Sequence, residues 1–130
     1  MQRDIETKLD VQKVMVRMLA FNDPERGDSL WRVVEVPKGK WDAADELGRL
    51  GLVFHYGQND FQPQQKSCSV SMADVIFLPT FAGETPVLTM HLVVGVGFKP
   101  ITQEEFIELE NMDRRDRSFS ALVRGNRHTA

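Results

Sequence analysis

The sequence predicts an α+β domain built on a small antiparallel, partly barrel-like sheet, with a short helix after the second strand and a C-terminal surface helix. Segments of alternating apolar and polar residues, a turn-rich stretch after the first of them and a capped helical pattern near the end predict this class. The chain has 130 residues, of which 42% are hydrophobic, enough for one domain with its own core. We expect one domain over residues 1–118 and a loosely ordered tail over 119–130.

The first strand is predicted over residues 11–21, where the apolar residues fit helical spacing as well as strand alternation. Val14 and Val16 are β-branched, and a run of strong turn residues follows at 22–27. These two features favour a strand over a helix. A second strand over residues 30–36 is expected to pair with the first as its antiparallel neighbour.

The second strand is expected to have two different faces. Alternation places Arg32 on the same face as Val34 and Val36, opposite Trp31 and Val33. Pro37 and the residues after it are expected to end the strand.

A short helix is predicted next, over residues 42–51. Asp42 is its expected N-cap, and Gly51 is expected to stop it at the C-terminal end. The apolar residues at helical spacing that should form its buried stripe are Ala43, Leu47 and Leu50.

The two clearest strands are predicted over residues 73–78 and 87–94, joined by a connection over 79–86. Gly95 and Gly97 follow them and are expected to mark a bulge or a strand end. No internal repeat or low-complexity segment interrupts this pattern.

The last helix is predicted to begin after Thr102, whose spacing to Glu105 fits a capping box, and to extend to about Arg117. Its apolar stripe is narrow, so the helix should lie on the surface of the sheet. The stripe consists of Phe106, Leu109 and Met112.

The composition excludes several classes of site. Lysine and arginine number 16 against 19 acidic residues, a net charge of −3, so binding to duplex DNA is not expected. Cys68 is the only cysteine and the three histidines are dispersed, so no disulfide, no metal site and no cofactor is expected. A single thiol fits a reducing, cytoplasmic setting.

Neither secretion nor membrane insertion is expected. Residues 1–10 are polar and carry no apolar signal core. The longest apolar run, residues 90–98, is interrupted by a histidine and two glycines and is far shorter than the roughly 20 residues of a spanning helix.

The residues that could carry chemistry have simpler structural interpretations, and no catalytic residue is assigned. His91 lies in the middle of a strand, where a hydrogen-bonded histidine is more common than a base or a ligand. Cys68 could be activated by His55 or His91, but no cationic neighbour lowers its pKa, so a packed or idle thiol is favoured. Asp74 is expected to accept backbone N–H bonds in a turn, with help from nearby serines.

The polar stretch that begins at His55 is long for a connection and is the best candidate for a functional loop. Residues 55–65 offer amide and carboxylate groups around one aromatic side chain, which suits recognition better than proton transfer. At Asp60 an Asx turn is an equally good interpretation, and the whole loop could merely cross a sheet edge. The candidate binding residues are His55, Gln58, Asn59, Asp60, Phe61 and Gln62.

Residues 56–63, 69–76 and 97–101 resemble a group of small uncharacterised proteins of phages, plasmids and other mobile elements. Those proteins share an Arg-Ser-x-Ser-Val-Gly-Asp-Val-aliphatic segment, followed by a hairpin and a Gly-aromatic ending. Here Cys68 stands where arginine is usual, and Met72 and Ala73 replace valine and glycine. The resemblance implies an α+β fold and an accessory role, without a catalytic residue. The matching positions are Ser69, Ser71, Asp74, Val75, Ile76, Gly97 and Phe98.

Two classes of function therefore follow from the sequence. The preferred one is a non-catalytic binding module that holds a protein or a small polar ligand with the loop 55–65. The alternative is an RNA- or nucleotide-related domain, with or without hydrolytic activity. The segment that begins one predicted strand after the polar loop is similar to the corresponding segment of PUA-like and ASCH-like domains. The sequence leaves the oligomeric state open. The arginines that favour the alternative are Arg114, Arg115, Arg117, Arg124 and Arg127.

Overall fold

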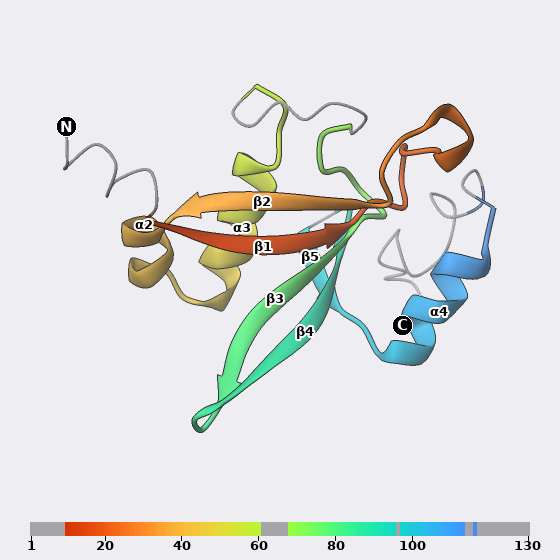
Figure 1. The fold of residues 1–130 in the computed structure, drawn as a ribbon. Helices are drawn as coiled ribbons and strands as arrows, with labels where there is room; N and C mark the ends of the chain where they lie inside the picture. Colours follow the sequence, from red (N-terminus) through yellow and green to blue (C-terminus); the bar gives the residue numbers. More distant parts are fainter. Residues whose placement is uncertain (1–9, 61–67, 96, 114–115, 117–130) are drawn as a thin grey trace.

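The computed structural model describes residues 10–60, 68–95, 97–113 and 116. These residues form one five-stranded antiparallel sheet in the order β2-β1-β3-β4-β5, with helices on both of its faces (Figure 1). The predicted α+β class is confirmed. The described strands leave β2 and β5 as the two edges, so the sheet is open and does not close into a barrel.

The strands are β1 (Val11–Arg17), β2 (Trp31–Pro37), β3 (Val75–Ala82), β4 (Thr85–Val94) and β5 (Gly97–Pro100). The helices are α2 (Lys38–Ala43), α3 (Glu46–Tyr56) and α4 (Gln103–Asn111), and a 3₁₀ turn, η1, spans Pro24–Arg26.

The choice of a strand for the first ambiguous segment is confirmed, although β1 is shorter than predicted and ends at Arg17. Val14 and Val16 are fully buried on one face, as expected of β-branched residues on a half-covered sheet. The turn predicted after this strand, over residues 22–27, is also confirmed. Asp23 caps η1, and Gly27 adopts a φ of 90°, a conformation that glycine reaches without a steric penalty.

The predicted helix over residues 42–51 is wrong at both ends, because the chain forms two helices there. Asp45, not Asp42, caps α3 by accepting a hydrogen bond from the Gly48 N–H at 2.8 Å. Gly51 lies inside α3, which continues for another turn to Tyr56. Because α3 begins at Glu46, its buried face differs from the predicted one. Leu50 is buried as expected and Val53 is buried with it, whereas Leu47 and Ala43 are exposed.

The predicted connection over residues 79–86 is also wrong, because β3 and β4 continue as a paired ribbon to Ala82 and Thr85. Pro79 had suggested the end of a strand. Beyond Phe77, however, β3 no longer pairs with β1, and a two-stranded ribbon leaves one edge of each strand free, where proline is tolerated. The turn itself uses Gly83 with a φ of 68°.

Strand β5 was not predicted, since Gly95 and Gly97 were interpreted as a bulge or a strand end. Gly97 has a φ of 98° and starts β5, which returns alongside β4. The capping box at the start of α4 is confirmed: Thr102 Oγ1 accepts from the Glu105 N–H, and Glu105 Oε1 accepts from the Thr102 N–H. The helix ends at Asn111 and not near residue 117, which lies outside the described residues.

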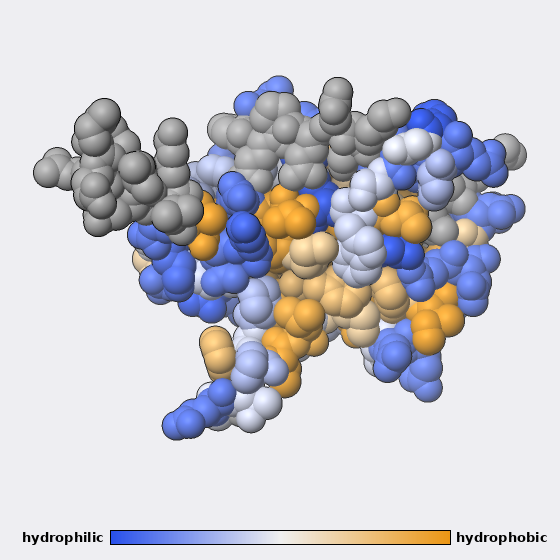
Figure 2. Space-filling view, in the orientation of Figure 1, coloured by the Kyte–Doolittle hydropathy of each residue, from blue (hydrophilic) through white to orange (hydrophobic). Residues whose placement is uncertain are grey.

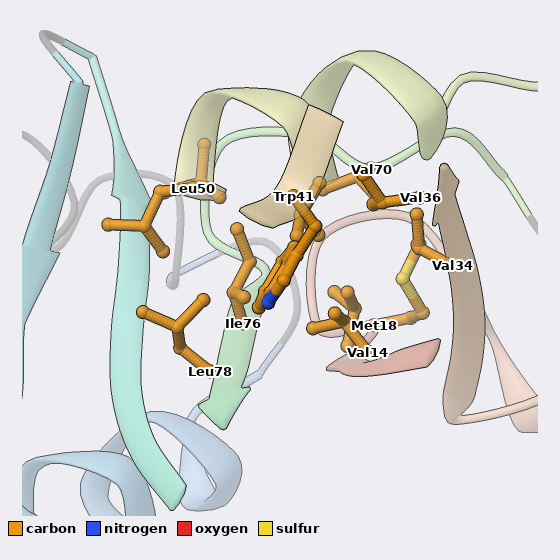
Figure 3. Packing of buried hydrophobic residues seen from close by; sticks show 12 residues of the cluster. Val14, Met18, Val34, Val36, Trp41, Leu50, Val70, Ile76 and Leu78 are labelled. Atoms are coloured by element: carbon orange, nitrogen blue, oxygen red, sulfur yellow. The ribbon is translucent and has the colours of Figure 1, made fainter. Parts of the chain in front are cut away.

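The core has two parts, one on each face of the sheet. Helices α2 and α3 cover the first face, where Figure 3 shows the Trp41 ring between Ile76 on one side and Val14 and Met18 on the other. Helix α4 lies on the second face, as predicted for a surface helix. Leu109 is its buried contact with the sheet.

Two glycines of the α3 segment allow a matched test of this packing. A Cβ at Gly57 would collide with the Val70 side chain and approach the Val53 carbonyl oxygen to 2.9 Å, whereas a Cβ at Gly51 would meet nothing within 4 Å. Gly57→Ala should therefore destabilise the protein by about 1–3 kcal/mol. Gly51→Ala should stabilise it by about 0.5–1 kcal/mol, because alanine is the better helix former.

Urea unfolding of both variants measures the two effects. A Gly57→Ala variant as stable as the wild type would contradict the close contact between the end of α3 and Val70.

Candidate functional site

The predicted recognition loop is only partly a loop in the structure. His55 lies in the last turn of α3, where its exposed ring contacts Tyr56 edge to face at 4.9 Å between centroids. Asp60 is exposed. Phe61 and Gln62 lie outside the described residues.

The side chains of Gln58 and Asn59 make hydrogen bonds within the protein. Gln58 Nε2 donates to the carbonyl oxygens of Phe54 and Val70 at 2.8 and 3.1 Å. Asn59 Oδ1 accepts from Arg32 Nη1 at 2.6 Å, and the Asn59 N–H donates to Ser69 Oγ. These contacts give both residues a structural role.

Arg32 is the buried cation beneath this segment. Its side chain enters the core from β2 on the same face as Val34 and Val36, as alternation predicted, and it is fully buried. Besides Asn59, its Nη1 donates to the carbonyl oxygen of Cys68 at 3.0 Å. Burial lowers the pKa of the Arg32 guanidinium, and the charge of Asp74 acts in the opposite direction.

Asp74 is the buried anion of the same region. Its Oδ1 accepts from the N–H groups of Leu19 and Ala20, each at 2.8 Å, and its Oδ2 accepts from the Ser71 N–H at 2.8 Å. The predicted turn role is confirmed by the bond to Ser71. The two bonds across the chain were not predicted, and they attach the segment after β1 to the start of β3.

Asn22 links the same two parts of the chain a second time. Its Oδ1 accepts from the Cys68 N–H at 2.9 Å, and its Nδ2 donates to the Ser29 carbonyl oxygen at 2.6 Å. Asn22, Arg32, Asn59 and Asp74 are together called the polar network. It joins the chain segments at one end of the sheet and leaves its own members little capacity to bind a ligand.

Ala73 shows the strain of this junction. It is buried and has a φ of 89°, a conformation that glycine adopts without steric cost.

His91 lies apart from both His55 and the polar network, on the face covered by α3. Its Nε2 is 2.8 Å from Thr89 Oγ1 and the residue is buried, so the predicted hydrogen-bonded strand histidine is confirmed. Burial lowers the pKa of His91, while Glu46 of α3 acts in the opposite direction. Burial therefore favours the neutral imidazole.

A cleft of about 510 Å³ lies between the turn after β1 and the end of α4. Arg17 stacks over Trp31 and forms an ion pair with Glu110 at 2.7 Å. The acidic excess in the cleft disfavours phosphate groups. The charged and amide side chains that line it are Arg17, Asn22, Asp23, Glu25, Glu110 and Asp113.

The sheet face that carries α4 is only partly covered. One cross-strand row on this face joins four strands through the register pairs of Val33 with Met15, Met15 with Phe77, and Phe77 with Met90. Phe106 of α4 contacts Phe77 of this row at 5.4 Å between ring centroids. Met15 remains 38% exposed. This row is called the body row.

The same apolar face continues onto the outer part of the β3–β4 hairpin, residues 78–89, which is called the arm. Pro79 pairs with Leu88 and Phe81 with Pro86 in direct continuation of the body row. Phe81 is 72% exposed and Leu88 is 62% exposed. The body row and these four arm residues are together called the apolar strip.

The outer end of the arm projects from the sheet at the lower left of Figure 1. In the same orientation, Figure 2 shows apolar atoms across the middle of this face and down the hairpin. Large exposed apolar patches commonly mark interaction sites. The sequence did not predict this surface, because the residues of the arm had been interpreted as a connection.

Comparison with protein-family models, curated proteins and solved structures finds no match to this chain. The resemblance to mobile-element proteins therefore stays a prediction. None of the helices in the described residues has the length and apolar character needed to cross a membrane. Those residues also contain no group of three or more side chains placed to hold a metal ion.

Single alanine variants separate the structural from the exposed residues of the predicted loop. Asn59→Ala should cost about 1–3 kcal/mol of unfolding free energy, because it leaves the buried Arg32 without one acceptor. Asp60→Ala should cost no more than about 0.5 kcal/mol, the usual scale for an exposed residue. Asp74→Ala should cost at least about 3 kcal/mol, since three backbone donors lose a charged acceptor.

Urea midpoints of the three variants give the order directly. Equal midpoints for the Asn59 and Asp60 variants would contradict the structural role of Asn59.

Proposed function

We propose that this protein is a non-catalytic interaction module that binds a protein surface through the apolar strip. The observation that carries the proposal is the continuity of the strip, from Val33 at one edge of the sheet to Phe81 on the arm. Aromatic and aliphatic side chains are the usual anchors of protein interfaces. The proposal keeps the accessory role and cytoplasmic setting that were expected from the sequence.

The distribution of charge supports a protein partner over a nucleic acid. The apolar strip carries no charged side chain among its described residues, and Lys13 and Glu35 border the body row as cross-strand partners of opposite sign. The arm carries one charge, that of Glu84 at its tip. Such a surface has nothing to neutralise a phosphate backbone, whereas an apolar centre with a polar border is typical of protein interfaces.

The predicted binding loop has less support than the strip. Gln58 and Asn59 make internal hydrogen bonds, and only His55 and Asp60 are exposed among its described candidates. The alternative of an RNA- or nucleotide-related domain also has less support. The acidic side chains of the cleft disfavour phosphate. The five arginines that suggested this alternative lie outside the described residues.

A photo-crosslinking amino acid at two matched positions tests the proposal in living cells. Phe81 on the strip and Leu47 on α3 are similarly exposed, at 72% and 67%, but only Phe81 belongs to the proposed binding surface. Irradiation should give a protein adduct from position 81 and little or none from position 47.

The mass of the adduct then identifies what lies on the strip. Equal adduct yields from the two positions, or none from position 81, would contradict binding through the strip.

A further inference from the structure

We infer that Pro79 and Pro86 close the two edges of the arm against pairing with a further strand, so that the arm meets other chains with its faces alone. The inference goes beyond the proposed function, because it holds whichever protein binds the apolar strip. It depends on the direction in which the main-chain groups of the arm point.

Both edges of the arm lack a neighbouring strand in the described part of the chain. Strand β1 pairs with β3 only as far as Phe77, and β5 pairs with β4 only from His91 onward. A free edge presents N–H and C=O groups with which another strand can pair, above all where its side chains are apolar. Phe81 and Leu88 are large, apolar and exposed, so the arm requires protection against such pairing.

The hydrogen-bonding register of β3 and β4 determines which residues face the edges. Val93 donates to the Asp74 carbonyl oxygen at 2.9 Å and accepts from the Ala73 N–H at 2.8 Å, so its main-chain groups point toward the β3 side. In an antiparallel pair this direction alternates along each strand. The odd-numbered residues of β4 therefore bond to β3, whereas the even-numbered Pro86 and Leu88 point outward.

Proline occupies an outward position on each edge of the arm. The residues of β3 that bond to β4 are even-numbered, so Pro79 and Phe81 point outward on the other edge. Because proline has no N–H, only Phe81 on β3 and Leu88 on β4 offer an outward donor. Neither proline is needed for the turn, which uses Gly83 with a φ of 68°. Proline on an edge is one of the means by which proteins prevent strand addition.

Strand β5, which borders the arm as an edge of the sheet, shows the same arrangement. The Ile101 N–H donates to the Met90 carbonyl oxygen at 3.1 Å, and alternation then points Lys99 toward β4. Phe98 and Pro100 face outward, so this edge also lacks one donor.

Restoring the two N–H groups tests the inference. The double variant Pro79→Thr/Pro86→Thr should form β-sheet aggregates that bind thioflavin T at least about tenfold faster than the wild type at equal concentration. Threonine is more polar than proline, so faster aggregation cannot come from added apolar surface.

Pro24→Thr is the matched control, because it makes the same change in η1, outside the sheet. Its aggregation rate should stay within about twofold of the wild-type rate. Urea unfolding should give the double variant a midpoint no lower than that of Pro24→Thr, which separates strand addition from aggregation after unfolding.

Hydrogen exchange in the wild type provides a test without substitution. The amides of Phe81 and Leu88 should exchange at least about tenfold faster than those of Thr80 and Val87, which point toward the neighbouring strand of the arm.

Equal protection of these four amides overturns the inference, because the edges are then already paired. So does a folded double variant that aggregates no faster than the wild type, or a Pro24→Thr variant that aggregates as fast as the double variant. Where the double variant does not fold, the exchange comparison alone decides.

Discussion

The carboxylate of Asp74 holds together the end of the sheet where four segments of the chain meet. It is fully buried and accepts three backbone N–H groups, two from the segment after β1 and one from the turn before β3. A buried carboxylate is costly unless its oxygens are hydrogen-bonded, and these bonds meet that requirement. Arg32 supplies the nearby positive charge, and Asn22 and Asn59 tie the remaining loops to the same place.

This arrangement explains why the polar loop and the binding surface are different parts of the molecule. Polar residues that look available for a ligand are used to satisfy a buried charge and to hold backbone groups at the end of the sheet. The apolar strip shows the opposite pattern, since large side chains remain exposed on the described face and make few polar contacts. The polar residues thus support the fold, while the apolar surface has the character of a site for a partner.

The sequence predicted the features that depend on neighbouring residues. The β-branched residues of β1, the turn at Asp23, the capping box at Thr102 and the turn role of Asp74 all follow from residues close together in the chain. The start of α3 did not follow, because aspartate is favoured at an N-cap and stands at both positions 42 and 45. Asp42 lies within α2, and Asp45 caps α3. The buried face of the helix was therefore predicted with the wrong phase.

The functional surface was harder to predict, because it depends on contacts between distant segments. Pro79 looks like the end of a strand until it is known that β1 stops pairing at Phe77, which frees an edge for proline. Arg32 was placed on the inner face by alternation, but its acceptor Asn59 is 27 residues away and no local pattern connects them. The positive φ of Ala73 follows from no local pattern, because this conformation is uncommon for any residue but glycine.

Native-state hydrogen exchange measured by NMR tests the role of Asp74 most directly. If the carboxylate holds the end of the sheet, the amides of Leu19, Ala20 and Ser71 should exchange only when the whole protein unfolds, with the same opening free energy as Val16. Exchange of these three amides at the rate of an exposed loop, while Val16 stays protected, would contradict the account.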